Sequence, residues 1–494
     1  MGSEYEKLEQ KVRKLINLEE TAEILHWDQE VMMPEGGAQA RAKELSTISG
    51  IRHDLLVSDE LGNIIEELEE QNLSNEQKAV LREIKREYHR SKKVESELVE
   101  RISEQSSATL EKWKKARKEQ DFSIVEEELS ELVELKREYA KQIDPDEEPY
   151  KVLFSDYEPY IRFETMEEIM SELKQELVPL IEKIRESGVE IDNCFDQRIP
   201  QKEQEELNKE ILNILGYDLN RGRLDVSEHP FTVGNQFDAR ITTRYSDEDI
   251  SRSIMPTIHE FGHALYELGL PQEKYGLPTG QSRDLSIHES QSRLWENHVG
   301  RSREFWEGVL SELGNTEGLE NITSEEAYRS INRVKKDNLV RVEADELTYH
   351  LHIMLRFELE RKLVNGEINV SELPELWNDK MEDLLGIRPE NDLEGVLQDI
   401  HWYQGSIGYF TTYSLGSVIS AQLYKTMEQE VDGLDSKIAK NSFEDLKDWL
   451  SENIHQHGKL YKTEDLVEKA TGEKPNSDYF VDYIKNKYAE IYNL

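Results

Sequence analysis

Residues 253–270, SIMPTIHEFGHALYELGL, have the pattern of a helix with one buried face. Apolar side chains recur at spacings of three and four, as in an amphipathic helix that packs on a core. The stripe comprises Ile254, Ile258, Phe261, Leu265 and Leu268. His259 and His263 lie four positions apart, so both project from one side of the helix with Cβ atoms about 5 to 6 Å apart. Both imidazoles can therefore point a ring nitrogen at one metal ion.

Glu260 and Gly262 extend this pattern. Glu260 is one residue off the face of the two histidines, where a carboxylate can accept a proton from water at the metal without binding the metal. Gly262 costs about 1 kcal/mol relative to alanine in a helix interior. Its presence indicates that another backbone or a ligand approaches closely. The segment therefore supplies two metal ligands and a general base.

A catalytic zinc usually takes three protein ligands and leaves one position for water. The segment DLSIHESQSRLWENHVG, residues 284–300, offers Glu289 on a second helix. His288 competes with it, and spacing favours the glutamate because two histidines and one glutamate form a known hydrolytic set. Glu296 is either a partner of a ligand or a solvated side chain.

The charge and composition of the chain exclude several partners. Its 494 residues include 104 acidic and 61 basic side chains, a formal net charge of −43. Such a charge repels phosphate backbones and anionic lipid surfaces, so neither nucleic acid nor membrane is an expected partner. No window reaches the roughly 18 apolar residues of a membrane span. The lone Cys194 and the absence of an apolar signal core predict a cytoplasmic protein.

Helical periodicity runs through most of the chain. Turn signals interrupt it at 32–39, 56–62, 72–77 and 144–150. Residues 229–249 instead alternate with a period of two, and Phe237 and Ile241 suit the strands of a β-hairpin. An exposed edge of such a sheet can hold an extended peptide. Helix is expected again from Ser246, acting as an N-cap.

Several separate motifs in this order resemble the carboxypeptidase Taq family of metallocarboxypeptidases. They are HPF (229–231), DARITTRY (238–245), HEFGH (259–263), HESQSRLWEN (288–297), LQDIHW (397–402) and GYFTTYSLG (408–416). The segments 25–45 and 339–360 are similar to the family as well, so the likeness covers nearly the whole chain. GYFTTY departs from it, because the family usually has a proline before the threonine.

The resemblance implies a mainly α-helical fold: one catalytic domain over residues 1–494, two-lobed with a deep cleft, a small β-hairpin near the active site and a neurolysin-like architecture. Its N-terminal lobe is expected at roughly 1–220 and the lobe with the metal site at roughly 221–494. It also implies a homodimer that removes single residues from peptide carboxyl termini with broad side-chain tolerance.

By motif matching, the resemblance assigns His259, His263 and Glu289 as metal ligands and Glu260 as the general base. It thus selects Glu289 over His288. One divalent ion per chain is expected, with zinc preferred and cobalt the alternative.

The chemistry also needs a donor to the oxyanion that forms as water attacks. The resemblance favours Tyr413 for this role, with Tyr409 in reserve. His401 could hold a substrate carbonyl or orient Tyr413, or be a core histidine beside Trp402, and Asp399 is a candidate partner for it.

A carboxypeptidase must also recognise a free carboxylate, and the arginine fork does so with two parallel hydrogen bonds. Arg341 matches the arginine carried over from the family. Arg356 is the second candidate, although it could simply pair with Glu358 or Glu360.

Other interpretations stay open at this point. His229, Asp238 and Arg240 border the cleft by resemblance, yet Asp238 and Arg240 could equally lock the hairpin to the helix. An endopeptidase would use the same metal chemistry. A structural metal is disfavoured, because structural zinc usually fills all four positions and no cysteine cluster exists here.

Overall fold

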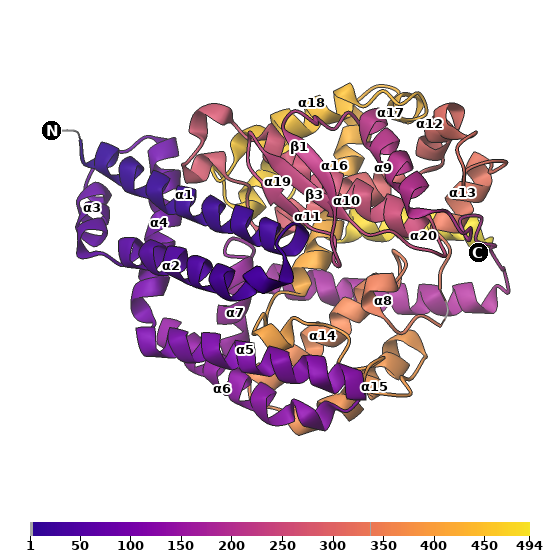
Figure 1. Cartoon of the computed structure of the whole chain (residues 1–494). Helices are drawn as coiled ribbons and strands as arrows, with labels where there is room; N and C mark the ends of the chain where they lie inside the picture. The colour runs from indigo at the N-terminus through magenta and orange to yellow at the C-terminus, as the bar shows by residue number, and fades with distance from the viewer. Residues whose placement is uncertain (1–2, 336) are drawn as a thin grey trace.

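The computed structural model describes residues 3–335 and 337–494, and these residues are mainly helical (Figure 1). The helices of the first half are α1 (Glu4–Val31), α2 (Ala38–Leu56), α3 (Asp59–Glu69), α4 (Asn75–Lys93), α5 (Ser96–Glu119), α6 (Glu126–Ile143), α7 (Pro149–Tyr157), α8 (Phe163–Glu186) and α9 (Gln201–Leu215). Those of the second half are α10 (Ser251–Gly269), α11 (Leu285–Arg293), α12 (Arg303–Leu313), α13 (Ser324–Ile331), α14 (Tyr349–Val364), α15 (Leu373–Leu385), α16 (Thr411–Glu430), α17 (Leu434–Ile438), α18 (Glu444–Asn453), α19 (Thr463–Thr471) and α20 (Asp478–Tyr492).

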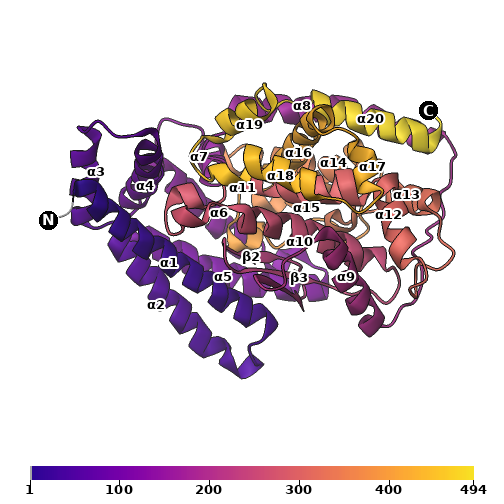
Figure 2. The same ribbon diagram turned by 90° about the horizontal axis from the view of Figure 1, so that it is seen from above.

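The four predicted turns separate helices as expected, and the mainly α fold class is confirmed. α1 and α2 lie side by side and project from the rest of the molecule (Figure 2). Capping boxes at Ser3 and Ser74 begin α1 and α4, because each serine accepts from a backbone N–H that the helix cannot satisfy. None of the described helices is long and apolar enough to cross a membrane.

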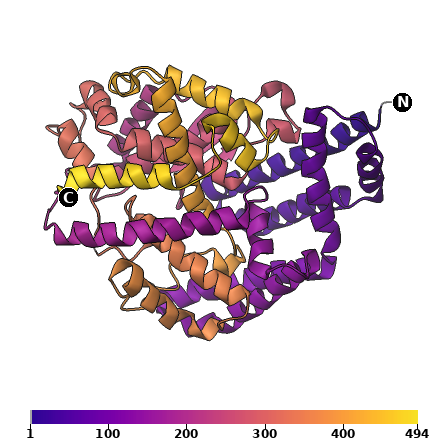
Figure 3. The ribbon, with the colours of Figure 1, turned by 180° about the vertical axis from the view of Figure 1, so that it is seen from behind.

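Two hydrophobic clusters form the core. The smaller joins α1, α3 and α4 and includes Leu8, Leu61 and Val80. The larger cluster contains buried side chains from Val94 to Tyr492. In it, α20 lies alongside α8 across the back of the molecule (Figure 3). The division into lobes near residue 220 stays a prediction.

The small sheet has the strand order β1-β3-β2, with β1 (Gly222–Val226), β2 (Thr232–Gly234) and β3 (Ala239–Thr243). β2 and β3 are antiparallel, so the predicted hairpin is present. β1 was not predicted. It pairs in parallel with β3 and not with the next strand, β2, and its GRLDV sequence lacks the alternation of a half-buried strand.

Two local predictions in this region were wrong. Phe237 lies in the turn between β2 and β3, where it is 47% exposed, because the hairpin turn begins at Asn235. Ser246 does not cap α10. Its hydroxyl accepts from the backbone N–H groups of Glu248 and Asp249 in a turn, and the helix begins only at Ser251.

Close packing of three helices sets the position of the metal-binding pattern. α10 crosses α11 at Gly262, where a Cβ atom would lie 2.6 Å from the carbonyl oxygen of Gln291 and from the Cα of Ser292. The close backbone approach inferred from Gly262 is therefore present. α16 crosses α11 in the same way at Gly416, where a Cβ would lie 2.5 Å from Glu289 Cγ. α11 is thus held between two helices, each of which meets it through a glycine.

Candidate metal centre

The three predicted ligands lie together where α10 meets α11. Glu289 Oε2 is 3.7 Å from His259 Nε2 and 3.5 Å from His263 Nε2. One ligand atom from each of the three residues lies within 4.8 Å of the other two. Two imidazole nitrogens and a carboxylate oxygen converging at this distance suit a divalent ion such as zinc. The residues present therefore fit a catalytic metal.

Glu296 fixes the orientation of His259. Its Oε2 lies 2.8 Å from His259 Nδ1, which donates to the carboxylate and leaves Nε2 facing Glu289. A second carboxylate that orients a ligating histidine in this way is common in metal sites. Two roles were left open for Glu296, the partner of a ligand or a solvated side chain. The structure supports the first, because the side chain is only 8% exposed.

Two arginines that the sequence interpretation missed hold these carboxylates in place. Arg293 donates to Glu289 Oε1 at 2.6 Å and to Glu296 Oε2 at 3.1 Å. Arg301 donates to Glu296 Oε1 at 3.0 Å. The signal was available for Arg293, which follows Glu289 by four residues and therefore shares its helix face.

Electrostatics prepare the three residues for a cation. Burial, followed by the neighbouring His288, lowers the pKa of His263 to about 3, so its imidazole is neutral. Burial also acts to lower the pKa of His259, but Glu289 and Glu296 outweigh it and the pKa is raised. Burial acts to raise the pKa of Glu289, and Arg293 with His259 lowers it below its ordinary value instead. A metal ion would therefore meet an ionised carboxylate at Glu289 and a neutral imidazole at His263.

His288 has a different environment from the three residues above. Its Nε2 lies 2.9 Å from Glu267 Oε1, and its ring stacks on that of His263 with 4.4 Å between the centroids. The structure thus turns His288 toward Glu267 and away from the cluster.

Glu260 lies beside the cluster and lines a cleft of about 960 Å³. The side chain is 6% exposed, and burial raises the pKa of its carboxyl. Thr232 on β2 donates to Glu260 Oε2 at 2.6 Å. The sequence interpretation did not single out Thr232, because nothing in a sequence indicates which hydroxyl of a short strand meets a helix 28 residues later.

Tyr413 and His401 line the same cleft, with 3.4 Å between the Tyr413 hydroxyl and His401 Nε2. Burial raises the pKa of Tyr413, which keeps the phenol neutral, and burial with Arg341 lowers the pKa of His401 to about 3. The ring of Tyr409 packs against both of them, at centroid distances of 5.3 Å and 5.4 Å. A neutral phenol beside a neutral imidazole can donate a hydrogen bond to a developing oxyanion.

Asp399 joins the two candidate arginines. Its Oδ1 accepts from Arg341 Nε at 2.9 Å and Nη2 at 2.8 Å, and its Oδ2 accepts from Arg356 Nε at 2.6 Å. Arg341 lines the cleft, and Arg356 is completely buried. The suggested pairing of Arg356 with Glu358 or Glu360 was wrong, since Arg356 instead meets the loop that carries Asp399.

The remaining residues of the strand region divide between the cleft and the N-terminal helices. His229 lines the cleft. Asp238 and Arg240 pair with each other at 2.6 Å, and the guanidinium of Arg240 lies over the ring of Trp27 on α1. They therefore fasten the hairpin to α1, and not to the histidine-bearing helix α10 as suggested from the sequence.

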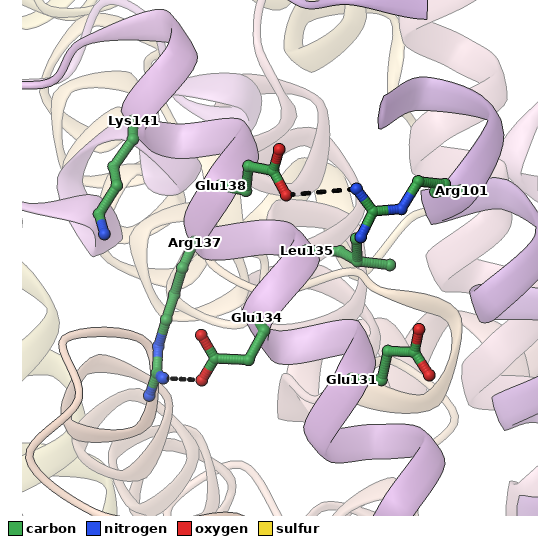
Figure 4. Close-up of a pocket in the computed structure, with 7 residues that line it drawn as sticks. All are labelled: Arg101, Glu131, Glu134, Leu135, Arg137, Glu138 and Lys141. Carbon is green, nitrogen blue, oxygen red and sulfur yellow. Dashed lines mark hydrogen bonds and ion pairs between the residues drawn. The ribbon is translucent and has the colours of Figure 1, made fainter. Parts of the chain in front are cut away.

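A smaller hollow between α5 and α6, of about 250 Å³, lies outside this site (Figure 4). Arg101 approaches Glu138 at 3.6 Å and Arg137 pairs with Glu134, so charged side chains of opposite sign compensate one another there. Such exposed pairs contribute little stability and indicate no chemistry.

The family model of the carboxypeptidase Taq (M32) metallopeptidases matches residues 7–488. The chain belongs to the carboxypeptidase Taq family. It is therefore a metallopeptidase that releases residues from peptide carboxyl termini, as the sequence predicted.

Individual relatives match over nearly their whole length. Thermostable carboxypeptidase 1 of Pyrococcus furiosus is 40% identical over 484 residues, 97% of each chain, and carboxypeptidase 1 of Bacillus subtilis is 36% identical over 490 residues, 98% of this chain and 97% of the relative. A crystal structure of an M32 carboxypeptidase from Deinococcus radiodurans R1 has a TM-score of 0.96 at 33% identity and covers 100% of both chains.

Proposed function

We propose that this carboxypeptidase removes one residue at a time, with broad side-chain tolerance, through a zinc ion held by His259, His263 and Glu289. The observation that carries this proposal is the convergence of the three donor atoms within 4.8 Å at the edge of the cleft. Zinc suits the two imidazoles and one carboxylate, and cobalt is the alternative ion because it accepts the same ligands.

In the proposed mechanism a bound divalent ion supplies Lewis acidity, which lowers the pKa of water and polarises the scissile carbonyl. Glu260 takes a proton from the attacking water and passes it to the amine that leaves. Tyr413 donates its O–H to the oxyanion. In the tautomer that carries its proton on Nε2, His401 would donate to the Tyr413 oxygen and leave the phenol proton for the substrate.

Arg341 is the proposed recognition residue for the terminal carboxylate of the substrate. Two buried guanidinium groups, Arg341 and Arg356, share the single carboxylate of Asp399, so this group of three carries an excess positive charge. A buried charge is costly unless an opposite charge compensates it. The carboxylate of a peptide would supply that charge at Arg341, which is the member of the group that lines the cleft. Arg356, completely buried, would support Arg341 through Asp399, and Tyr409 would pack beside Tyr413.

The same charge argues against an endopeptidase. An endopeptidase with this metal chemistry would bind an uncharged chain on both sides of the cleaved bond, and a compensating carboxylate would not be needed.

The remaining inferences concern assembly and location. We infer a homodimer, which rests on the family resemblance, and a cytoplasmic enzyme, which the lone Cys194 supports. Light scattering and cell fractionation test these two inferences.

The experiment for the metal and the base compares Glu260→Gln with the wild-type enzyme and with Glu273→Gln, a surface glutamate that serves as a matched control. Glu260→Gln should keep one metal ion per chain, measured by elemental analysis, and lose about 100- to 10,000-fold in kcat. Glu273→Gln should match the wild type in both. Normal turnover by metal-loaded Glu260→Gln would disprove the role of Glu260, and a metal content that does not change in His263→Ala would disprove the ligand assignment.

A further inference from the structure

The hydroxyl of Thr232 is directed at the carboxylate of Glu260. Its Oγ1 lies 2.6 Å from Glu260 Oε2 and 3.2 Å from the main-chain oxygen of the same residue. A threonine hydroxyl has one proton to donate. The shorter distance and the charge of the carboxylate both favour donation to Oε2, because hydrogen bonds to ionised acceptors are shorter and stronger than those to neutral ones.

This hydrogen bond is the main polar contact of the Glu260 carboxylate. Among residues 3–335 and 337–494, no other side chain donates a hydrogen bond to the Glu260 carboxylate, although Glu260 is only 6% exposed. A long side chain without such a partner would keep several rotamers in the cleft. Thr232 therefore determines which way the carboxylate faces.

The sheet that carries Thr232 is fastened to α10 through β3. Thr232 lies opposite Ile241 in the antiparallel pairing of β2 and β3. At the end of β3, the hydroxyl of Thr243 lies 3.2 Å from the Ser253 carbonyl oxygen and 2.9 Å from the Thr257 hydroxyl, both on α10. A donor on such a scaffold can hold a reacting group more precisely than one on a free loop.

We propose that Thr232 is a positioning residue for the reaction. Its hydroxyl holds Oε2 of Glu260 so that Oε1 is left for the attacking water. This assignment rests on the role proposed above for Glu260. The water proton goes to Oε1 and then to the leaving amine. Throughout, Oε2 remains an acceptor, so the Thr232 hydrogen bond persists in both protonation states and need not break during turnover.

Three substitutions test this assignment with zinc-loaded enzyme. Thr232→Val keeps the shape and removes the donor; it should lower kcat by about 10- to 100-fold, the range for a misplaced reacting group, with KM within about twofold. Thr232→Ser restores a hydroxyl and should return kcat to within about threefold of the wild type. Thr243→Val is the control for sheet docking, because it removes the hydroxyl that joins β3 to α10 without touching Glu260, and its loss of kcat should be clearly smaller than that of Thr232→Val.

The outcomes separate three possibilities. A wild-type kcat in Thr232→Val, alongside an inactive Glu260→Gln, would overturn the role of Thr232 and leave that of Glu260 intact. An active Glu260→Gln would overturn both. An equal loss in Thr232→Val and Thr243→Val, or a Thr232→Ser variant as slow as Thr232→Val, would show that the hydroxyl only docks the sheet on α10 and would also overturn the assignment.

Discussion

A methyl group on Gly416 should weaken metal binding, because α16 meets Glu289 through this glycine. A Cβ atom at Gly416 would lie 2.5 Å from Glu289 Cγ and 2.6 Å from Glu289 Cβ. Carbon atoms in contact prefer about 3.5 to 4.0 Å, so the Glu289 side chain or the helices must move by about 1 Å. Metal sites tolerate deviations of only about 0.2 Å in ligand distances.

The energetic consequence divides into two parts. Alanine stabilises a helix interior by about 1 kcal/mol relative to glycine, and overpacking costs about 1 to 3 kcal/mol, so the metal-free protein should lose up to about 2 kcal/mol of unfolding free energy. Displacement of Glu289 should lower zinc affinity by at least about tenfold. The extra stability that bound zinc confers would then fall by about 1.4 kcal/mol.

Two assays on Gly416→Ala measure these quantities: competition with a chromogenic chelator for zinc affinity, and thermal unfolding with and without zinc. Gly50→Ala is the matched control, since Gly50 lies inside α2 and a Cβ there meets no atom within 4 Å. It should bind zinc normally and gain up to about 1 kcal/mol. Zinc affinity in Gly416→Ala equal to that in Gly50→Ala would refute the view that this glycine positions a ligand.

Three further predictions concern buried charges. Arg341→Lys keeps the charge and loses the fork, so KM for unmodified peptides should rise by about 10- to 100-fold in steady-state assays; an unchanged KM would exclude Arg341 from carboxylate recognition. Lys487→Met removes the cation that lies 2.7 Å from buried Glu346 and should lower the free energy of unfolding by up to about 3 to 5 kcal/mol in denaturant titrations, with Glu346→Gln in the same chain recovering much of the loss. Although burial acts to raise the pKa of Asp399, its two arginines lower the pKa below its ordinary value, so its stabilising effect is complete above about pH 5 and declines as the pH falls below about 4. The unfolding free energy of Asp399→Asn should thus differ most from that of the wild type near neutral pH, and a difference that grows in acid would contradict this sign.

The sequence predicted those parts of the protein that depend on local pattern. That His259 and His263 lie on one face follows from helix geometry alone, and the residues between the helices are of types that favour turns. Gly262 signalled a close approach that the structure contains. Choosing Glu289 over His288 needed the family resemblance, because both lie on the same short helix and either could face the metal.

The parts that could not be predicted depend on contacts between distant segments. β1 exists through its parallel pairing with β3. The late start of α10 is an exception, because Ser246 and Asp249 there accept from backbone N–H groups only two or three residues later. Arg356 pairs with Asp399, 43 residues away, and not with the acidic residues nearest to it in sequence. The hydrogen bond from Thr232 to Glu260 is of the same kind. Such contacts decide how the site is held, and a one-dimensional pattern does not encode them.

The central claim is tested most directly by mass spectrometry of one peptide and its carboxyl-amidated twin after incubation with zinc-loaded enzyme and with a chelator-treated control. The account predicts a ladder of products shortened one residue at a time from the carboxyl end of the free peptide. That ladder should be absent from the amidated peptide and from the chelated control. Internal fragments from both peptides would contradict the account and make the protein an endopeptidase.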